Sequence, residues 1–585
     1  MDTQYFLQMG SSVLLAHGTG KPVEDAVTEV NIPAAGCYGI FVRTRDWAAL
    51  WSKGSSPGMF TLTIDGKSLP VTMGGDRCFE WHWQSAGTLD LEAGSHTLSL
   101  HDLTGFDGRC DSILLTTAGQ APGNSVEDIF ALRRDLCAVK DQSRDGGSFD
   151  LIVVGGGITG MCVALAAARL GSKVALVQDR KLLGGNNSSE IRVALGGRIN
   201  IGPYPRLGYI LNEFAPENKG NARPAHIYED QRKTDIILNE KNITLLTGYM
   251  MSEVEKSADD AISAIIITDL ETYEKTRLCA PLFCDCTGDA TLGFMAGADC
   301  HMGRESRDEF GEVSAPEKGD KMTMGSSVMW YSEEEPDPQQ FPDIDWGLEL
   351  DEETVQVVHR GQWYWETGMR LNQIADAERI RDYGIYVAVS NWNYLKNHYS
   401  RREDYRNSSL AWLSFVAGKR ESRRIMGEFI LKEQDIKDFV HYPDASVSIS
   451  WHIDQHFPCP ENERRFPTGA YLSRATLDHV KYYPVPYRCF YSRDIKNLFM
   501  AGRNISVTHM ALGTVRVMRT TAMIGEVVGM AASVCRKHAA LPADVYHKYL
   551  DELKALMKEG TGRTDVPYTQ IYTLIEEDPG WREDN

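Results

Sequence analysis

The feature that most constrains this chain is an apolar run of strand length, residues 149–154, that leads directly into a glycine-rich turn. The turn has the pattern Gly-x-Gly-x-x-Gly (GxGxxG) at Gly155, Gly157 and Gly160, and a segment rich in small residues follows at 161–170. A strand, turn and helix in this order bind the pyrophosphate of a dinucleotide, because the glycines bring backbone N–H groups and a helix N-terminus close to the phosphates. The sequence therefore predicts a Rossmann-like domain of the α/β class.

A second predicted strand, residues 173–177, ends where such domains bind the ribose, about 20 residues after the last glycine. Gln178, Asp179 and Arg180 follow it, so we expect them to contact the cofactor. The loop 183–190 comes next and is rich in glycine and polar residues. A flavin nucleotide needs such donors along its phosphates and ribityl chain, whereas NAD enzymes usually do not. The candidate cofactor-binding residues of this loop are Gly185, Asn186, Ser188 and Ser189.

Two later turns fit the same cofactor. Residues 281–284 form an apolar segment that leads into a turn with Gly288 and Asp289. Residues 497–501 lead into a turn formed by Gly502, Arg503 and Asn504. These three residues are candidate FAD contacts, together with Gly513 and Arg516 further along the chain. Each turn alone is equally compatible with an ordinary loop, but their order in the chain favours the ribityl and pyrimidine end of FAD.

At this point the chain resembles bacterial FAD-dependent oxidoreductases of the glutathione-reductase-like, fumarate-reductase-related superfamily, often found among carbohydrate-utilisation genes. Four segments carry the resemblance, which extends roughly over residues 148–540: GGGITG (155–160), QDRKLLGGNNSSEIRV (178–193), DCTGDATLG (285–293) and PVPYRCFYSRDIKNLFMAGRNISVTHMALGTVRVMRTTAMIGEVVG (484–529). The resemblance implies FAD as cofactor. One position departs from the wider superfamily: a Glu usually ends the second strand, and here Gln178 offers a neutral amide to the ribose hydroxyls.

Charge, apolar runs and cysteine spacing argue against several kinds of binding site. With 61 basic and 81 acidic residues the formal charge is −20, which speaks against nucleic acid. The chain has no apolar run of about 18 residues and no secretory signal at its N-terminus, which predicts no membrane span and a cytoplasmic or periplasmic location. Its twelve cysteines include no CxxC pair, so we expect no metal or iron–sulfur site, and Cys284 and Cys286 are not expected to form a disulfide.

The first 116 residues have a different pattern. Short segments with alternating polarity are separated by Gly, Pro and Asp turns, which predicts an all-β, jelly-roll-like sandwich similar to domains that accompany carbohydrate enzymes. Trp81 and Trp83 share a strand face there, where they serve either core or interdomain packing or a sugar platform. Residues 117–147 are predicted to be a linker with a short helix at 126–136, capped by Ser125.

The remaining boundaries follow from the motifs. The FAD-binding domain is expected to comprise 148–300 and 484–540, with a small β-meander at about 240–284, and a helical extension is expected at 541–585. The resemblance implies that the inserted residues 301–483 form a cap that covers the substrate and sets specificity.

The cap contains two informative patterns. Residues 418–427 predict a helix on which Arg420 and Arg424 share a face, either to bind an anionic or polyhydroxyl group or as a structural ion-pair cluster. Residues 448–456 alternate, so an extended segment would place His452, Asp454 and His456 on one face. The alternatives for these histidines are a catalytic base, a metal site and structural packing.

His456 and His509 are the candidate catalytic residues. Oxidation of a C–H bond next to a hydroxyl requires a base for the hydroxyl proton, and His suits that role near neutral pH. His509 lies between two FAD motifs and is expected near the isoalloxazine ring, with packing or cofactor support as the alternative. Arg192 is expected to brace FAD or the cap, together with Glu190, and Arg519 joins Arg516 as a candidate for flavin or substrate oxygens.

The sequence therefore predicts an FAD-dependent oxidoreductase that transfers hydride between a polar organic substrate, carbohydrate-derived in the family context, and flavin N5. The expected partner is a small molecule, with sugars and sugar acids as candidate classes. A single GxGxxG in full context argues against an additional NAD(P) site. The rival hypothesis is a glycan-binding or scaffolding protein that retains FAD as a structural ligand.

Overall fold

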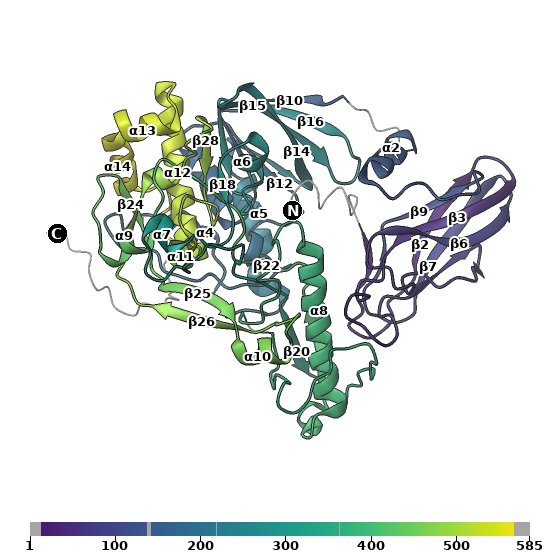
Figure 1. The fold of residues 1–585 in the computed structure, drawn as a ribbon. Helices are drawn as coiled ribbons and strands as arrows, with labels where there is room; N and C mark the ends of the chain where they lie inside the picture. The colour runs from purple at the N-terminus through teal and green to yellow at the C-terminus, as the bar shows by residue number, and fades with distance from the viewer. Residues whose placement is uncertain (1–12, 137–141, 218, 362, 567–585) are drawn as a thin grey trace.

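The centre of the molecule is a five-stranded parallel sheet (Figure 1). The computed structural model describes residues 13–136, 142–217, 219–361 and 363–566. The strand order is β13-β12-β11-β17-β28, with bounds Ile243–Thr247, Val174–Gln178, Leu151–Val154, Leu282–Asp285 and Leu498–Met500. All four neighbouring pairs are parallel. The four strands from β12 to β28 are buried throughout and are apolar apart from Gln178 and Asp285 at the carboxyl ends of β12 and β17, as expected when helices or loops cover both faces. The α/β, Rossmann-type fold is thus present.

Two helices rich in small residues pack closely beside this sheet. α3 (Ile158–Arg169) begins at the glycine turn, and α12 (Met518–His538) packs along it. A side chain at Gly525 would collide with the Thr159 carbonyl, and one at Gly529 would collide with Ala166. Glycine at both positions therefore allows the late helix to lie against the first one, so the two ends of the FAD-binding sequence share one core.

A smaller, mostly antiparallel sheet is attached to this core. Its order is β10-β16-β15-β14, with bounds Arg144–Ser148, Lys275–Cys279, Ala261–Asp269 and Tyr249–Ala258. The meander predicted for 240–284 is present, because β14, β15 and β16 pair in succession. β10 pairs with β16 in parallel and begins within the predicted linker 117–147, so this sheet begins before the glycine motif.

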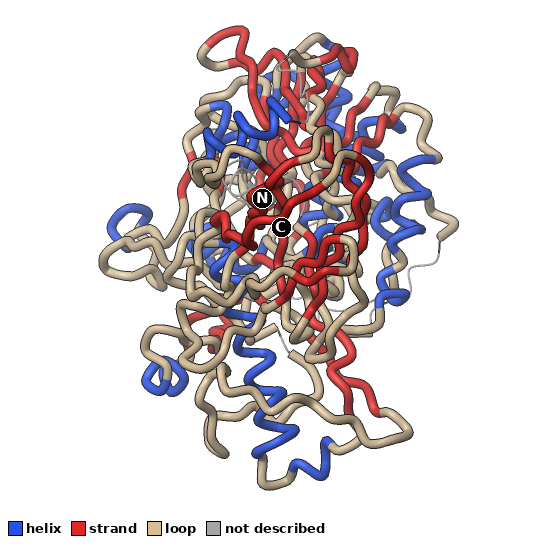
Figure 2. The backbone as a smooth tube through the Cα atoms, turned by 90° about the vertical axis from the view of Figure 1, so that its right-hand side faces the viewer, coloured by secondary structure: helices blue, strands red, loops and turns tan. Residues whose placement is uncertain are grey.

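The N-terminal region contains two antiparallel sheets that enclose one apolar core. The first has the order β2-β7-β4-β5 (Ala26–Ile32, Gly94–Asp102, Phe60–Ile64, Lys67–Ser68), and the second has the order β6-β3-β9 (His82–Leu91, Gly36–Thr44, Ser112–Thr116). Ile40, Val42 and Leu62, from both sheets, are fully buried between them. This arrangement is consistent with the expected sandwich, and Figure 2 views the molecule from that side.

The predicted helix after this region is α2 (Val126–Leu136). The Ser125 hydroxyl accepts a hydrogen bond from the Asp128 N–H (3.1 Å) and donates one to the Asp128 carboxylate (2.6 Å), as in a helix cap. Trp83 packs against this helix in a buried cluster with Phe41 and Ile129, and Trp81 lies at the contact with the cap. Both tryptophans are at least nine-tenths buried, so they serve packing and interdomain contact rather than an exposed sugar platform.

The inserted segment 301–483 is built around the long helix α8 (Ala377–Asn393), which lies on the side of the molecule that carries the sandwich (Figure 1). Two antiparallel strand pairs accompany it, β20 with β21 (Trp330–Glu334, Ser408–Leu413) and β25 with β26 (Ile453–Pro458, Ser473–Asp478). The helices α13 (Pro542–Lys548) and α14 (Leu550–Glu559) follow α12, and residues 567–585 of the predicted extension lie outside the described residues. None of the helices in the described ranges is long and apolar enough to cross a membrane.

The helix predicted for 418–427 was wrong. The segment contains two short extended pieces, β22 (Gly418–Lys419) and β23 (Arg424–Ile425), which pair with different strands. Arg420 and Arg424 are buried and contact separate carboxylates, Glu366 and Glu305. The tertiary requirement to pair two buried cations outweighs the local helical spacing.

Candidate functional site

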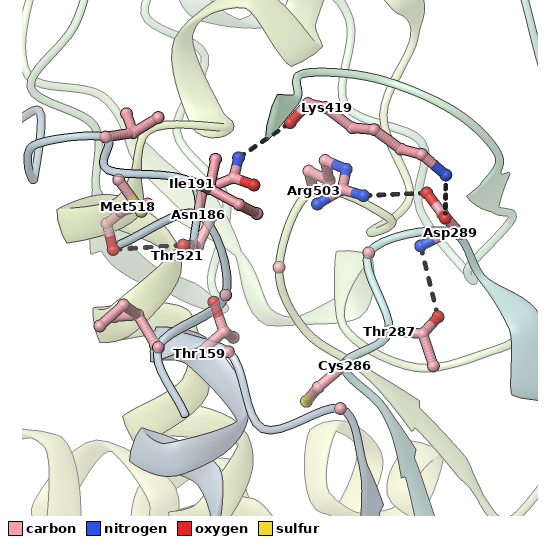
Figure 3. Close-up of a pocket in the computed structure, with 18 of the residues that line it drawn as sticks. Thr159, Asn186, Ile191, Cys286, Thr287, Asp289, Lys419, Arg503, Met518 and Thr521 are labelled. Atoms are coloured by element: carbon pink, nitrogen blue, oxygen red, sulfur yellow. Dashed lines mark hydrogen bonds and ion pairs between the residues drawn. The ribbon is translucent and has the colours of Figure 1, made fainter. Parts of the chain in front are cut away.

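A cavity of about 450 Å³ lies where the carboxyl ends of the central strands meet the cap. Residues directly after β11, β12, β17 and β28 line it, which is where ligands bind in open α/β sheets. The predicted cofactor-binding residues on its wall are Gly155, Gly157, Gln178, Asp179, Arg180, Gly185, Asn186, Gly288, Asp289, Gly502, Arg503 and Arg516. The structure thus brings together turns that are far apart in the sequence, and Figure 3 shows several of them around the cavity.

The glycine turn is shaped by close backbone packing. A side chain at Gly155, whose φ is 108°, would collide with the Cys286 carbonyl, and one at Gly160 would collide with the Gly155 carbonyl. A Cβ at Gly157 would meet only the Gly185 Cα, at 4.0 Å, so the space in front of Gly157 is part of the cavity. The first turn of α3 carries no acidic residue and no side-chain cap in the described structure, and Ile158 and Thr159 of this turn line the cavity.

Gln178 holds the glycine turn in place. Its Oε1 accepts a hydrogen bond from the Gly156 N–H at 2.7 Å, and its Nε2 donates to the Leu182 carbonyl at 3.3 Å. The amide therefore joins the turn to the start of the polar loop. Contact between Gln178 and the ribose stays a prediction, with Asp179 and Arg180 on the same part of the wall.

Some of the residues predicted in the polar loop line the cavity, and others do not. Gly185 and Asn186 line the cavity, and Asn186 Nδ2 donates to the Lys419 carbonyl at 3.0 Å. Ser188 and Ser189 do not line it: Ser188 is buried, and the Ser189 N–H donates to Asp230. The Arg192 guanidinium also lies away from the wall, 3.8 Å from the centre of the Trp412 ring.

Asp289 links the third turn to the late turn and to the cap (Figure 3). Its carboxylate pairs with Lys419 Nζ at 2.6 Å and with Arg503 at 2.9 Å. Burial alone would raise the pKa of Asp289, but Lys419 and Arg503 hold it well below its usual range, so the group stays ionised. Asn504 does not line the cavity; it donates to the buried Asp285 at 3.0 Å and ties β28 to β17.

The cap side of the cavity is aromatic and charged. Its lining includes Trp363, Phe415 and Trp451, together with Arg381, Arg420, Arg516 and Asp454. The Arg420 guanidinium lies 3.6 Å from the centre of the Trp363 ring and 3.4 Å from Glu366. Planar stacking on one face and a carboxylate at the edge hold this arginine in a single orientation.

His456 lies in a buried cluster directly behind this wall. Its Nδ1 bonds the Glu366 carboxylate, and its Nε2 lies 3.1 Å from Asp454 Oδ1 and 3.4 Å from Arg516. Burial lowers the pKa of His456, but Glu366 and Asp454 outweigh burial and raise it. Arg516 and His456 in turn hold the pKa of Asp454 well below its usual range, against the effect of burial. Asp454, rather than His456, lines the cavity.

The other predicted histidines are placed differently. His509 begins α11 (His509–Val515), and its Nδ1 bonds Glu421 at 2.9 Å; it does not line the cavity. Gly513 of the same helix permits close packing on β25, since a Cβ there would lie 2.9 Å from the Asp454 N. The ring of His452 packs edge-on against His479 at 4.1 Å, and the described part of the chain contains no cluster of three His, Cys, Asp or Glu side chains suited to a metal ion.

A model of the family described as FAD dependent oxidoreductase matches residues 150–557, more than half of the chain. The chain belongs to this family. It is therefore an FAD-dependent oxidoreductase, and its cofactor is FAD.

The similarity to individual proteins is either low or limited to a short stretch of sequence. Glycerol-3-phosphate dehydrogenase 1 of Mycobacterium tuberculosis is 47% identical over 53 residues, which are 9% of this chain and 10% of that protein, so the chain spans about a tenth of the length of the curated relatives it matches. A geranylgeranyl bacteriochlorophyll reductase-like protein from Thermoplasma acidophilum has 12% identity and a TM-score of 0.31 over 70% of this chain and 83% of that one. OxyS anhydrotetracycline hydroxylase from Streptomyces rimosus has 13% identity and a TM-score of 0.30 over 71% and 66%.

The cavity of this FAD-dependent oxidoreductase fits its cofactor. The open space at Gly157 and the N-terminus of α3 are suited to the pyrophosphate, and the residues after β12 are suited to the adenosine ribose. Lys419, which belongs to the cap and pairs with Asp289, was missed in the sequence. Lys419 and Asp289 are 130 residues apart in the sequence, so no local motif predicts that they pair.

Proposed function

We propose that the protein oxidises a hydroxyl-bearing, carbohydrate-derived small molecule held at the cap side of the cavity. The observation that carries the proposal is the Asp454–His456–Glu366 series of contacts, because it joins a cavity-lining carboxylate to a buried imidazole. When bound, FAD supplies the two-electron acceptor for the hydride that leaves the substrate carbon. The protein must then receive the hydroxyl proton.

Asp454 is the member of the series that a substrate hydroxyl can reach from the cavity. The hydroxyl proton moves from the substrate oxygen to Asp454 and on to Nε2 of neutral His456, at 3.1 Å, while Glu366 fixes Nδ1–H and stabilises the resulting imidazolium. Arg516, at 3.1 Å from Asp454, keeps the carboxylate oriented. His509 stays a predicted catalytic residue, and its contacts with Glu421 support a positioning role at the start of α11.

Support for a carbohydrate-derived substrate is chemical. The cap side offers aromatic faces at Trp363, Phe415 and Trp451 next to charged hydrogen-bonding groups. Apolar ring faces beside polar groups suit a ring-shaped molecule with several hydroxyls. The resemblance to proteins found among carbohydrate-utilisation genes favours the same class.

The proposal is tested by adding candidate sugars and sugar acids to the FAD-loaded protein without oxygen and following the visible flavin band. Bleaching by one of them supports oxidation. Binding of glycans without bleaching by any of them would instead support a glycan-binding protein that retains FAD as a structural ligand. His456→Gln should slow bleaching and leave the FAD content unchanged; an unchanged rate would remove His456 from the mechanism.

A further inference from the structure

The cap contributes one continuous segment, residues 414–422 (the roof segment), to the wall of the cavity. The glycine turn, with Gly155 and Gly157, lines the same cavity. The roof segment and the glycine turn therefore enclose one space. The residues of the roof segment that line this space are Phe415, Val416, Ala417, Lys419 and Arg420.

Two hydrogen bonds tie the roof segment to the polar loop that follows β12. The buried Ser414 hydroxyl donates to the Glu190 carbonyl at 2.7 Å. Asn186 Nδ2 donates to the Lys419 carbonyl at 3.0 Å. The polar loop thus holds the roof segment at one edge of the cavity.

Side chains of the roof segment are also tied to the turn that follows β17. Lys419 Nζ pairs with Asp289 Oδ2 at 2.6 Å. The Ser422 hydroxyl donates to Asp289 Oδ1 at 2.7 Å and to the Gly288 carbonyl at 3.0 Å. Lys419 is therefore held from both sides, by Asn186 at its carbonyl and by Asp289 at its ammonium group (Figure 3).

The order of the strands places the glycine turn between these two anchor points. β11, which ends at the glycine turn, lies between β12 and β17 in the sheet. A segment that joins the loop after β12 to the turn after β17 therefore passes across the carboxyl end of β11. The space in front of Gly157 at that end is suited to the pyrophosphate of FAD.

We propose that the roof segment must lift for FAD to enter or leave, and that Lys419 is the positioning residue that latches it closed. The Lys419 side chain is 16% exposed, whereas Ser414 and Ser422 are at most 1% exposed, so Lys419 is the anchor nearest to solvent. Its contacts with Asn186 and Asp289 join protein atoms only. They stabilise the closed roof equally with and without FAD, so their loss lowers the barrier for entry and for exit alike.

The test measures FAD exchange in the whole chain. The dissociation rate constant is obtained by exchange of bound FAD for an excess of isotope-labelled FAD, and the association rate constant by mixing apoprotein with FAD. In Lys419→Met both rate constants should rise at least about tenfold, or ~1.4 kcal/mol of barrier, while the dissociation constant changes by less than either. Lys419→Arg keeps a cation for Asp289 and should exchange FAD at nearly the wild-type rates.

Lys437→Met is the matched control. Lys437 is another lysine of the cap that pairs with a buried carboxylate, Glu433, and it is not among the residues that line the cavity. Its rate constants should equal those of the wild type. If Lys419→Met fails to fold, Ser414→Ala makes the same test at the polar loop, and both of its rate constants should rise.

A wild-type dissociation rate in Lys419→Met would overturn the inference. Faster dissociation with unchanged association would also overturn it, because Lys419 would then be an ordinary contact of bound FAD. Equal acceleration in Lys437→Met would show a general loosening of the cap in place of a latch. These rates are measured without a substrate, so failure of the proposed oxidation is a separate result, in which no candidate bleaches the flavin.

Discussion

The two sides of the cavity are built from different kinds of interaction. The strand side is made of backbone: Gly155, Gly157 and Gly160 lie within one turn, and their missing side chains create the space and the close approach. The cap side is made of paired charges brought together from distant segments, as in the contact between Glu366 and His456 across 90 residues. A glycine-rich turn can be recognised in a sequence because its residues are close together in the chain. A buried network of charged residues cannot, because it forms only when the tertiary fold brings distant residues together.

The largest expected effect concerns the strand side. Gly160→Ala should destabilise the protein by about 1–3 kcal/mol and abolish FAD binding, because the new Cβ collides with the Gly155 carbonyl. Thermal unfolding and the ratio of visible to ultraviolet absorbance of the purified protein measure the two effects.

Gly157→Ala is the matched variant for this comparison. Its Cβ meets only Gly185, at 4.0 Å, so folding should be retained while FAD affinity falls at least about tenfold, or ~1.4 kcal/mol. Normal FAD affinity in Gly157→Ala would contradict the assignment of this space to the cofactor.

A smaller effect is expected from the charge network. Proton transfer requires neutral His456, so the rate of oxidation should fall as pH falls through the pKa of His456, which Glu366 and Asp454 raise above its ordinary value. Glu366→Gln removes one of these charges and should move the midpoint to lower pH. Anaerobic bleaching rates between pH 5 and 9 measure the midpoint, and a midpoint that stays in place or moves upward would contradict this role of Glu366.

The smallest effect is expected at Gln178. A carboxylate can accept the Gly156 N–H as the amide does, so Gln178→Glu should change FAD affinity by only a few-fold, well under ~1.4 kcal/mol. FAD titration of the refolded apoprotein measures this. A loss of a hundredfold or more would mean that the amide contacts the ribose directly.

The contrast between the two sides explains what the sequence could predict. The parallel strands, the meander and the helix at 126–136 follow from local apolar patterns and from the cap at Ser125. The segment around Arg420 was mispredicted as a helix, because its spacing is helical but its buried cations pair with separate carboxylates. Lys419 was missed for the same reason, since its role depends on its pairing with Asp289.

The central claim is that the strand side binds FAD and the cap side accepts the substrate proton. Asp454→Asn tests both parts in one sample, through its FAD content and its anaerobic bleaching rate with an oxidisable substrate. The account predicts full FAD content and bleaching slowed by about 10²–10⁴-fold. Bleaching at the wild-type rate, or loss of FAD from a folded variant, would contradict it.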